Sequence, residues 1–305
     1  MNSFELIDPR LIDHVLPEHD GYPPELAAED TPDALWDAAG DAAREFPQEL
    51  WIEPRDWADK ARDNDKYNNW AINYLDRFTN QHPTHECTCH ALRAGMEAAW
   101  NRQRAIKVGP PIAGQRLPIS AKSHSVWFSC LSVYAEANPR QRGGASTRGV
   151  MEIAARRGMI PDTIQPRDYA FAHRLTGTAG RGGINQSRGA WVPLSRFPAG
   201  WQTTARQFRP LEVIIPRIWE QTVCLLLHGH AVGHGRSGHA VTLVGWNPTS
   251  QVAPYIDSYD VIRYDSIRNI RAGLVSAYCI ASVSVPDNWD DLLSGTPGFH
   301  HALAG

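Results

Sequence analysis

Near Thr176 the sequence pattern changes from helical to strand-favouring, and this change limits the folds that the chain can adopt. Upstream of Thr176, apolar residues recur at helical spacing, and capping residues flank them. This pattern predicts helices over residues 91–100, 125–138 and 146–160. Downstream, a glycine-rich loop precedes runs that favour strands, over residues 223–234, 239–247 and 253–270. A helical half followed by a strand-rich half predicts an α+β fold with two lobes and a cleft between them.

The N-terminal residues are strongly acidic. Residues 1–50 hold 13 Asp and Glu against Arg10 and Arg44, a net charge of −11, so a whole-chain charge of −3 leaves +8 for the other 255 residues. We therefore expect an acidic arm over 1–50, one domain over 51–290 and a C-terminal tail over 291–305. The domain begins with an irregular lead-in, followed by a short helix near Tyr67 to Phe78.

Composition excludes several partners and locations. The basic residues form no blocks, so nucleic acid is not an expected partner. The first residues lack a basic stretch followed by an apolar one, and no window approaches the roughly 18 apolar residues of a membrane helix. Five cysteines at irregular spacing predict free thiols. We expect a soluble cytoplasmic protein without membrane insertion.

One short segment concentrates side chains that bind metals or act as nucleophiles. It contains His82, His85, Cys87, Cys89 and His90. A metal site could use these residues, or the strand-borne histidines His228, His230 and His234, but the spacing matches none of the usual paired zinc ligands. We therefore expect no metal and no cofactor. Thr88 is a plausible N-cap, which would place Cys89 in the first turn of a helix.

A thiol becomes nucleophilic when a helix N-terminus and an imidazole lower its pKa from about 8.5. Cys89 has the helix position, whereas Cys87, two residues earlier, is expected to be a packed or exposed thiol. His239, at the start of a predicted strand, could supply the imidazole, and Asp257 could orient it. These residues predict a Cys-His-Asp site.

Several segments, in this order, resemble the papain family of cysteine peptidases. They are DWADK from Asp56, the pair Asn80–Gln81, CHALRA from Cys89, the pair Gly143–Gly144 with the helix after it, HAVTLVGW from His239, and DSY from Asp257. The resemblance implies a papain-like fold with a helical left lobe and a β-barrel-like right lobe. It also implies Cys89 as nucleophile, His239 as general base and acid, Asp257 as its orienter and Gln81 as an oxyanion donor. Gly143 and Gly144 would edge the substrate cleft, and Tyr259 would shield the histidine.

The sequence also departs from the family pattern. Gln81 precedes Cys89 by eight residues, where the family usually has six. His90 replaces the usual Trp, Asp257 replaces Asn, and Tyr259 replaces Trp. No cysteine stands at 140–142, before the glycine pair, where the family places a disulfide partner. A carboxylate at Asp257 would hold an imidazolium more strongly than an amide does.

The favoured interpretation is a cysteine peptidase that hydrolyses peptide or protein substrates through a thiol acyl-enzyme. A second is related amide chemistry on the same residues, such as cleavage of cell-wall peptides or isopeptide bonds, or acyl transfer. A third is a papain-like domain kept as a structural or binding component of a larger assembly, for example a virus particle, with its chemistry reduced or lost. In that case the protein would be found in the virion.

Overall fold

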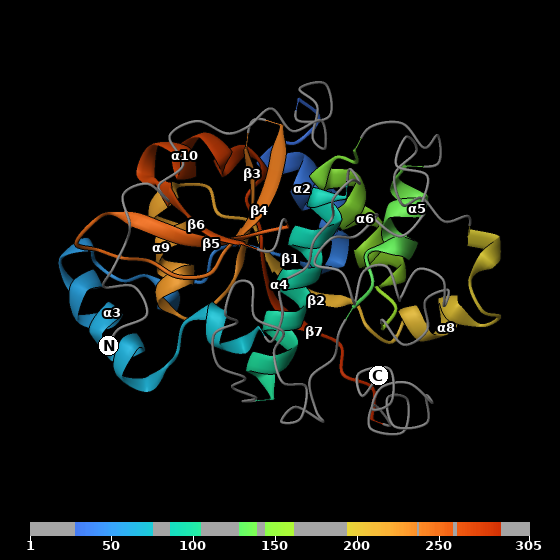
Figure 1. The fold of residues 1–305 in the computed structure, drawn as a ribbon, viewed down its shortest axis with the longest axis horizontal. Helices are drawn as coiled ribbons and strands as arrows, with labels where there is room; N and C mark the ends of the chain where they lie inside the picture. Colours follow the sequence, from blue (N-terminus) through green and yellow to red (C-terminus); the bar gives the residue numbers. More distant parts are fainter. Residues whose placement is uncertain are drawn as a thin grey trace.

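The computed structural model describes residues 28–75, 86–104, 128–138, 144–161, 194–236, 238–258 and 261–287. Its helices are α2 (Pro32–Ala39), α3 (Trp57–Tyr67), α4 (Cys87–Gln103), α5 (Leu131–Ala137), α6 (Thr147–Arg157), α8 (Trp201–Ala205), α9 (Trp219–Leu227) and α10 (Ile267–Ala272). Its strands are β1 (Ala43–Arg44), β2 (Pro210–Ile214), β3 (Val232–Arg236), β4 (His239–Leu243), β5 (Val252–Asp257), β6 (Val261–Ser266) and β7 (Cys279–Val283). This mixture of helices and sheets confirms the predicted α+β class (Figure 1).

Helix α4 lies at the centre of the described structure, between the sheet that contains β3 and β4 and the helices α5 and α6 (Figure 1). Every residue from Cys87 to Asn101 is buried. A helix enclosed on all sides must present apolar residues to more than one neighbour. Accordingly, its residues divide among three buried clusters: one that includes α2 and α6, one that includes α9 and strands β3 to β5, and a small one with Ala240 of β4.

The strands form two sheets. In the first, β1 pairs parallel with β2, and β2 pairs antiparallel with β7. The second is antiparallel in the order β3-β4-β5-β6. Its edge strands β3 and β6 do not pair with each other in the part of the chain that is described, so the barrel closure expected from the resemblance is not formed there.

A backbone bridge connects the two sheets. The amide of Gly233 in β3 donates to the carbonyl of Tyr278, just before β7, at 2.8 Å, and the amide of Tyr278 donates back at 3.0 Å. Gly233 has to be a glycine here, because an added Cβ would overlap the Tyr278 ring. The bridge joins the β3 edge of one sheet to the other sheet.

Part of the predicted acidic arm belongs to the folded core. Leu35, Ala38 and Ala39 of α2 are buried, and β1 is the edge strand of the first sheet. The acidic side chains of α2, Asp33 and Asp37, are exposed, so a count of charges does not distinguish this amphipathic helix from a solvated arm. Residues 1–27 and the predicted tail at 291–305 lie outside the described residues.

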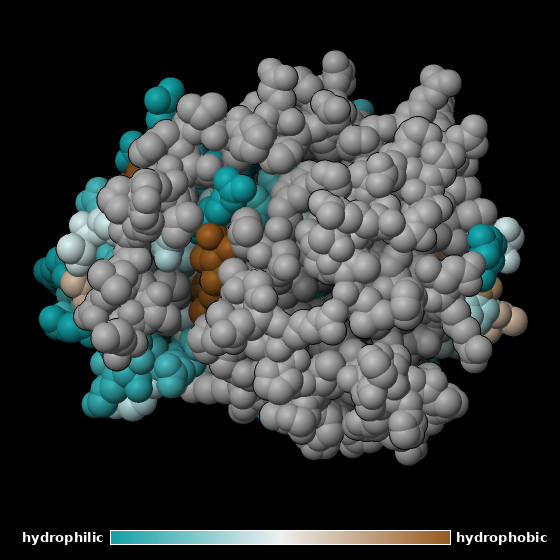
Figure 2. All heavy atoms as spheres, in the orientation of Figure 1, coloured by the Kyte–Doolittle hydropathy of each residue, from teal (hydrophilic) through white to brown (hydrophobic). Residues whose placement is uncertain are grey.

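Two helices differ from the sequence expectation. The run beginning at Val223 favours a strand, but residues 223–227 belong to α9, since a short apolar run fits a buried helix equally well. Helix α3 occupies the lead-in that was expected to be irregular, and its Trp57, Ala61 and Asn64 face inward. Hydrophilic side chains cover the left edge of Figure 2, where α3 lies in Figure 1.

None of the helices in the described ranges combines the length and the apolar character needed to cross a membrane.

Candidate active site

The two cysteines at the start of α4 point to opposite sides of the helix. They are two residues apart, which corresponds to a rotation of about 200° in an α-helix. Cys87 is the first residue of α4 and forms a small buried cluster with Ala91 and with Ala240 of β4. Cys89 belongs to the large cluster that contains the neighbouring helices. Cys87 therefore faces the strand that carries His239, and Cys89 faces the helical core.

His239 lies between a thiol and a carboxylate. Its Nε2 is 2.8 Å from Oδ1 of Asp257, and the Cys87 side chain lies near enough to the imidazole to raise its pKa. Burial alone would lower the pKa of His239, but the hydrogen bonds and charges of Asp257 and Cys87 outweigh it and raise the pKa to about 9. These partners favour the protonated form of the imidazole.

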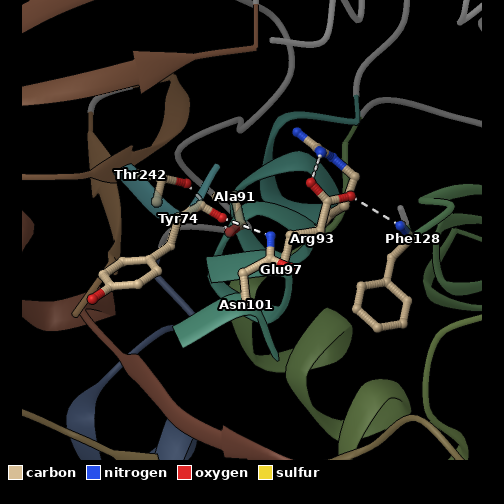
Figure 3. A network of polar contacts seen from close by, with 7 residues as sticks. All are labelled: Tyr74, Ala91, Arg93, Glu97, Asn101, Phe128 and Thr242. Atoms are coloured by element: carbon tan, nitrogen blue, oxygen red, sulfur yellow. Dashed lines mark hydrogen bonds and ion pairs between the residues drawn. The ribbon is translucent and has the colours of Figure 1, made fainter. Parts of the chain in front are cut away.

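Local structure fixes His239 beside α4. His239 pairs in register with Arg236, so a tight turn joins β3 to β4. Gly238, at the end of this turn, has a φ of 73°, a left-handed conformation that favours glycine. The hydroxyl of Thr242 then donates to the carbonyl of Ala91 at 3.3 Å, which attaches β4 to α4 (Figure 3).

Asp257 is the last residue of β5, and its carboxylate is buried. Its Oδ2 lies 3.5 Å from Nε of Arg263, on the neighbouring strand β6. The carboxylate therefore contacts His239 through one oxygen and a guanidinium through the other. A buried carboxylate needs such partners, because an isolated charge is costly to bury.

A buried polar network holds α4 in place on its other side. Glu97 accepts a hydrogen bond from Arg93 at 2.6 Å and another from the backbone amide of Phe128 at 2.9 Å (Figure 3). Nearer the C-terminal end of α4, Asn101 donates to the carbonyl of Tyr74 at 2.7 Å. These contacts join two separate chain segments to the helix that carries both cysteines.

The position of Cys89 differs from the sequence expectation. The thiol that interacts with His239 belongs to Cys87, which was expected to be a packed or exposed thiol rather than part of the site. Burial, followed by the nearby Cys130, Glu86 and Cys87 side chains, raises the pKa of the Cys89 thiol well above its usual value. These surroundings favour a neutral, packed thiol at Cys89.

Two signals in the sequence could have identified Cys87, rather than Cys89, as the thiol beside His239. Gln81 precedes Cys87 by six residues, which is the family spacing, whereas it precedes Cys89 by eight. In addition, Cys89, Leu92 and Met96 are spaced three and four apart, so Cys89 is itself part of the apolar stripe of the helix.

The other predicted site residues are only partly described. Gly144 is buried, two residues before the Ser146 that caps α6. The hydroxyl of Thr88 donates to the carbonyl of Ala145 at 3.0 Å, so this segment lies against the first turn of α4. Gln81, Gly143 and Tyr259 lie outside the described residues.

The histidines of the alternative metal site are dispersed. His90 lies 3.7 Å from the Glu86 carboxylate, and His234 lies 3.5 Å from the Asp265 carboxylate. Burial lowers the pKa of His230 to about 3. Within the described ranges no three His, Cys, Asp or Glu side chains form a group that could hold a metal ion. His82 and His85 lie outside these ranges.

No family model and no curated protein matches the chain. Among solved structures, the chain is similar to xylellain, a cysteine protease from Xylella fastidiosa. The two share 13% sequence identity over 70% of this chain and 85% of xylellain, with a TM-score of 0.46. At this level of likeness, the chemistry of the site has to be argued from its own geometry.

Proposed function

We propose that the chain is a cysteine-type peptidase that uses Cys87, His239 and Asp257. The observation that carries the proposal is the position of His239 on β4, the strand against which Cys87 packs: its Nε2 lies 2.8 Å from Asp257, and its imidazole interacts with the Cys87 side chain. A nucleophile, a base and a group that orients the base are the three components of this type of site. We replace Cys89 by Cys87 as the proposed nucleophile.

Two features of Cys87 support this role. It is the first residue of α4, where the free backbone amides of the first turn favour a negative charge. It also adjoins an imidazole whose pKa is raised to about 9, so a thiolate and an imidazolium would stabilise each other.

The reaction follows from these positions. The Cys87 thiolate attacks the carbonyl carbon of the peptide bond, a C–S bond forms, and the carbonyl π electrons move to oxygen. The C–N bond then breaks, and the amine leaves with the proton of His239. Water next attacks the thioester while His239 takes one of its protons. The C–S bond breaks, which releases the acid and restores the thiolate and imidazolium pair.

The oxyanion would be held by the backbone amide of Cys87 and the side-chain amide of Gln81. With Cys87 as nucleophile, Gln81 stands six residues upstream, which supports this assignment. Gly143 and Gly144 remain the proposed edge of the substrate cleft, and Tyr259 the proposed shield of His239. The proposed substrates are peptides or proteins.

A second candidate function is a structural or binding domain with lost chemistry. Burial favours it, because Cys87 and His239 are both 0% exposed and Asp257 is 1% exposed. A retained but unused Cys-His-Asp cluster would be packed in this way, whereas a working nucleophile has to meet its substrate.

Alkylation with iodoacetamide at mildly acidic pH separates the two functions. We compare the wild-type protein with Cys87→Ala and the matched control Cys89→Ala, and locate the label by peptide mass mapping. If the peptidase proposal is correct, wild type and Cys89→Ala are labelled at Cys87, and His239→Ala is labelled at least about tenfold more slowly because the imidazolium partner is lost. The rates at which these proteins cleave a mixed peptide library should rank in the same order as their labelling at Cys87.

Labelling at Cys89 that persists in Cys87→Ala would contradict the assignment of the nucleophile. A Cys87 that reacts no faster in wild type than in His239→Ala, together with an uncleaved peptide library, would favour the binding domain.

A further inference from the structure

The two carboxylate oxygens of Asp257 face different partners. Oδ1 faces Nε2 of His239 at 2.8 Å, and Oδ2 faces Nε of Arg263 at 3.5 Å. The Asp257 side chain is 2% exposed and that of Arg263 is 31% exposed, so the guanidinium connects the buried site to the surface. Arg263 was not among the candidates identified from the sequence.

The short contact between Asp257 and His239 creates a chemical problem. A buried carboxylate beside an imidazolium stabilises the proton on the ring, and the pKa of His239 is raised to about 9 accordingly. The proposed reaction nevertheless needs His239 to give this proton to the leaving amine. A base that binds its proton too tightly is a poor general acid near neutral pH.

The charges around His239 come from four elements. Helix α4 contributes Cys87, with Glu86 just before it, and strand β5 contributes Asp257. Strand β3 contributes Arg236, which is paired in register with His239. Its Nη2 lies 3.2 Å from Oδ1 of Asp265, and its guanidinium lies 4.9 Å from the centre of the Tyr255 ring. Strand β6 contributes Arg263.

Register explains why Arg263 reaches this site. Arg263 pairs with Tyr255, two residues before Asp257 on β5. Opposed residues in an antiparallel pair share a face, and so do residues two apart on one strand. Arg263 is therefore a diagonal neighbour of Asp257, within reach of a long side chain. A cation at this position draws negative charge toward Oδ2 and weakens the attraction that Oδ1 exerts on the imidazolium.

We propose that Arg263 is a positioning residue that shares Asp257 with His239, fixes the carboxylate in place and keeps the imidazolium proton available for the leaving group. The proposal rests on the proposed peptidase function, in which His239 acts as a general acid. In this role Arg263 acts through Asp257.

The test compares Arg263→Met, which removes the charge, with Arg263→Lys, which keeps it. Arg206→Met, at an exposed position after α8, controls for the loss of one positive charge. The first measurement is the NMR titration midpoint of the His239 ring, assigned with His239→Gln. The second is the pH profile of kcat and KM for a peptide that the wild type cleaves.

We expect Arg263→Met to raise the His239 midpoint by roughly half to one pH unit, because the pair is partly exposed and screened. It should also lower kcat at neutral pH by about three- to tenfold with KM little changed, since one unit corresponds to a factor of about ten. Arg263→Lys and Arg206→Met should behave like wild type.

An unchanged His239 midpoint in Arg263→Met would overturn the proposal, and so would equal shifts in Arg263→Met and Arg206→Met. Arg263→Gln replaces Arg263→Met if the latter does not fold. The failure of the proposed function looks different, because a protein that cleaves no peptide still yields the titration. In that case a shifted midpoint would support the coupling of Arg263 to His239 while the peptidase assignment falls.

Discussion

The proposed Cys87–His239–Asp257 cluster makes protein stability depend on pH in a specific window. The pKa of His239 is about 9 in the folded protein and 6.5 for an unperturbed histidine. A group whose pKa is higher in the folded state binds its proton more tightly there. The resulting stabilisation is complete below pH 6.5 and is lost as the pH rises through about 9.

The size of the effect follows from the shift. The difference between about 9 and 6.5 is about 2.5 units, and at about 1.4 kcal/mol per unit it corresponds to roughly 3–4 kcal/mol. A domain is typically stable by about 5–15 kcal/mol, so this loss would be a large fraction of the total. Asp257→Asn removes the carboxylate, so burial should keep His239 neutral in the folded protein. The loss of stability at high pH should then disappear.

The assay is urea unfolding at several pH values between 6 and about 9.5 for wild type, Asp257→Asn and His239→Gln. The His239→Gln series corrects for groups that titrate in every variant, including the buried thiol of Cys89. Between pH 6 and about 9.5 we expect the free energy of unfolding of the wild type to fall by about 3 kcal/mol more than that of either variant. Parallel curves for all three proteins would refute the argument that Asp257 holds the proton on His239.

Two further predictions concern the support of α4 and of the sheet. Glu97→Ala removes the carboxylate that pairs with the buried guanidinium of Arg93 and should lower the free energy of unfolding by about 3–5 kcal/mol. The double variant Arg93→Met/Glu97→Leu should be nearly neutral. Urea unfolding measures both variants, and equal losses would contradict the reasoning. Gly273→Ala should destabilise by about 1–3 kcal/mol because the new Cβ would overlap the His234 ring. In Gly95→Ala the new Cβ would make only an ordinary van der Waals contact, at 3.6 Å. This variant should be as stable as wild type or more stable by up to about 1 kcal/mol. Thermal melting of both variants checks that Gly273→Ala is the less stable.

Helix α6 shows what local sequence signals could predict. The sequence offers Ser146 or Thr147 as its cap and Gly158 as its end. The Ser146 hydroxyl accepts a hydrogen bond from the amide of Gly149 at 3.1 Å, and Gly158 ends the helix with a φ of 79°. Both signals act through contacts within one or two turns, so no tertiary information is needed to interpret them.

The segment from Asp30 to Arg44 shows where local signals fail. Its acidic composition favours a solvated arm, but the Asp30 carboxylate accepts hydrogen bonds from the backbone amides of Thr147 and Arg148, at 2.9 and 2.7 Å. These partners lie 117 and 118 residues away in the chain. A carboxylate that caps a distant helix has the same composition as one exposed to water, so the charge count alone could not separate them.

Two residues of the candidate site were named from the sequence, and Arg263 was found only in the structure. His239 and Asp257 were both named from the sequence, and the structure brings them within 2.8 Å of each other. Arg263 could not be found in this way, because its contact with Asp257 depends on the register of β5 against β6. Register is set by the pairing of whole strands rather than by any single residue.

The choice between Cys87 and Cys89 depends on where α4 begins. A helix that began after a Thr88 cap would place Cys89 at its first position. Instead the Thr88 hydroxyl donates to Ala145, and the helix begins at Cys87. At about 100° per residue, the stripe of Cys87 and Ala91 then faces β4, and that of Cys89, Leu92 and Met96 faces the helical core. The hydrogen bond from Thr88 to Ala145, 57 residues away in the chain, thus occurs together with the helix start that turns Cys87 toward β4 and His239.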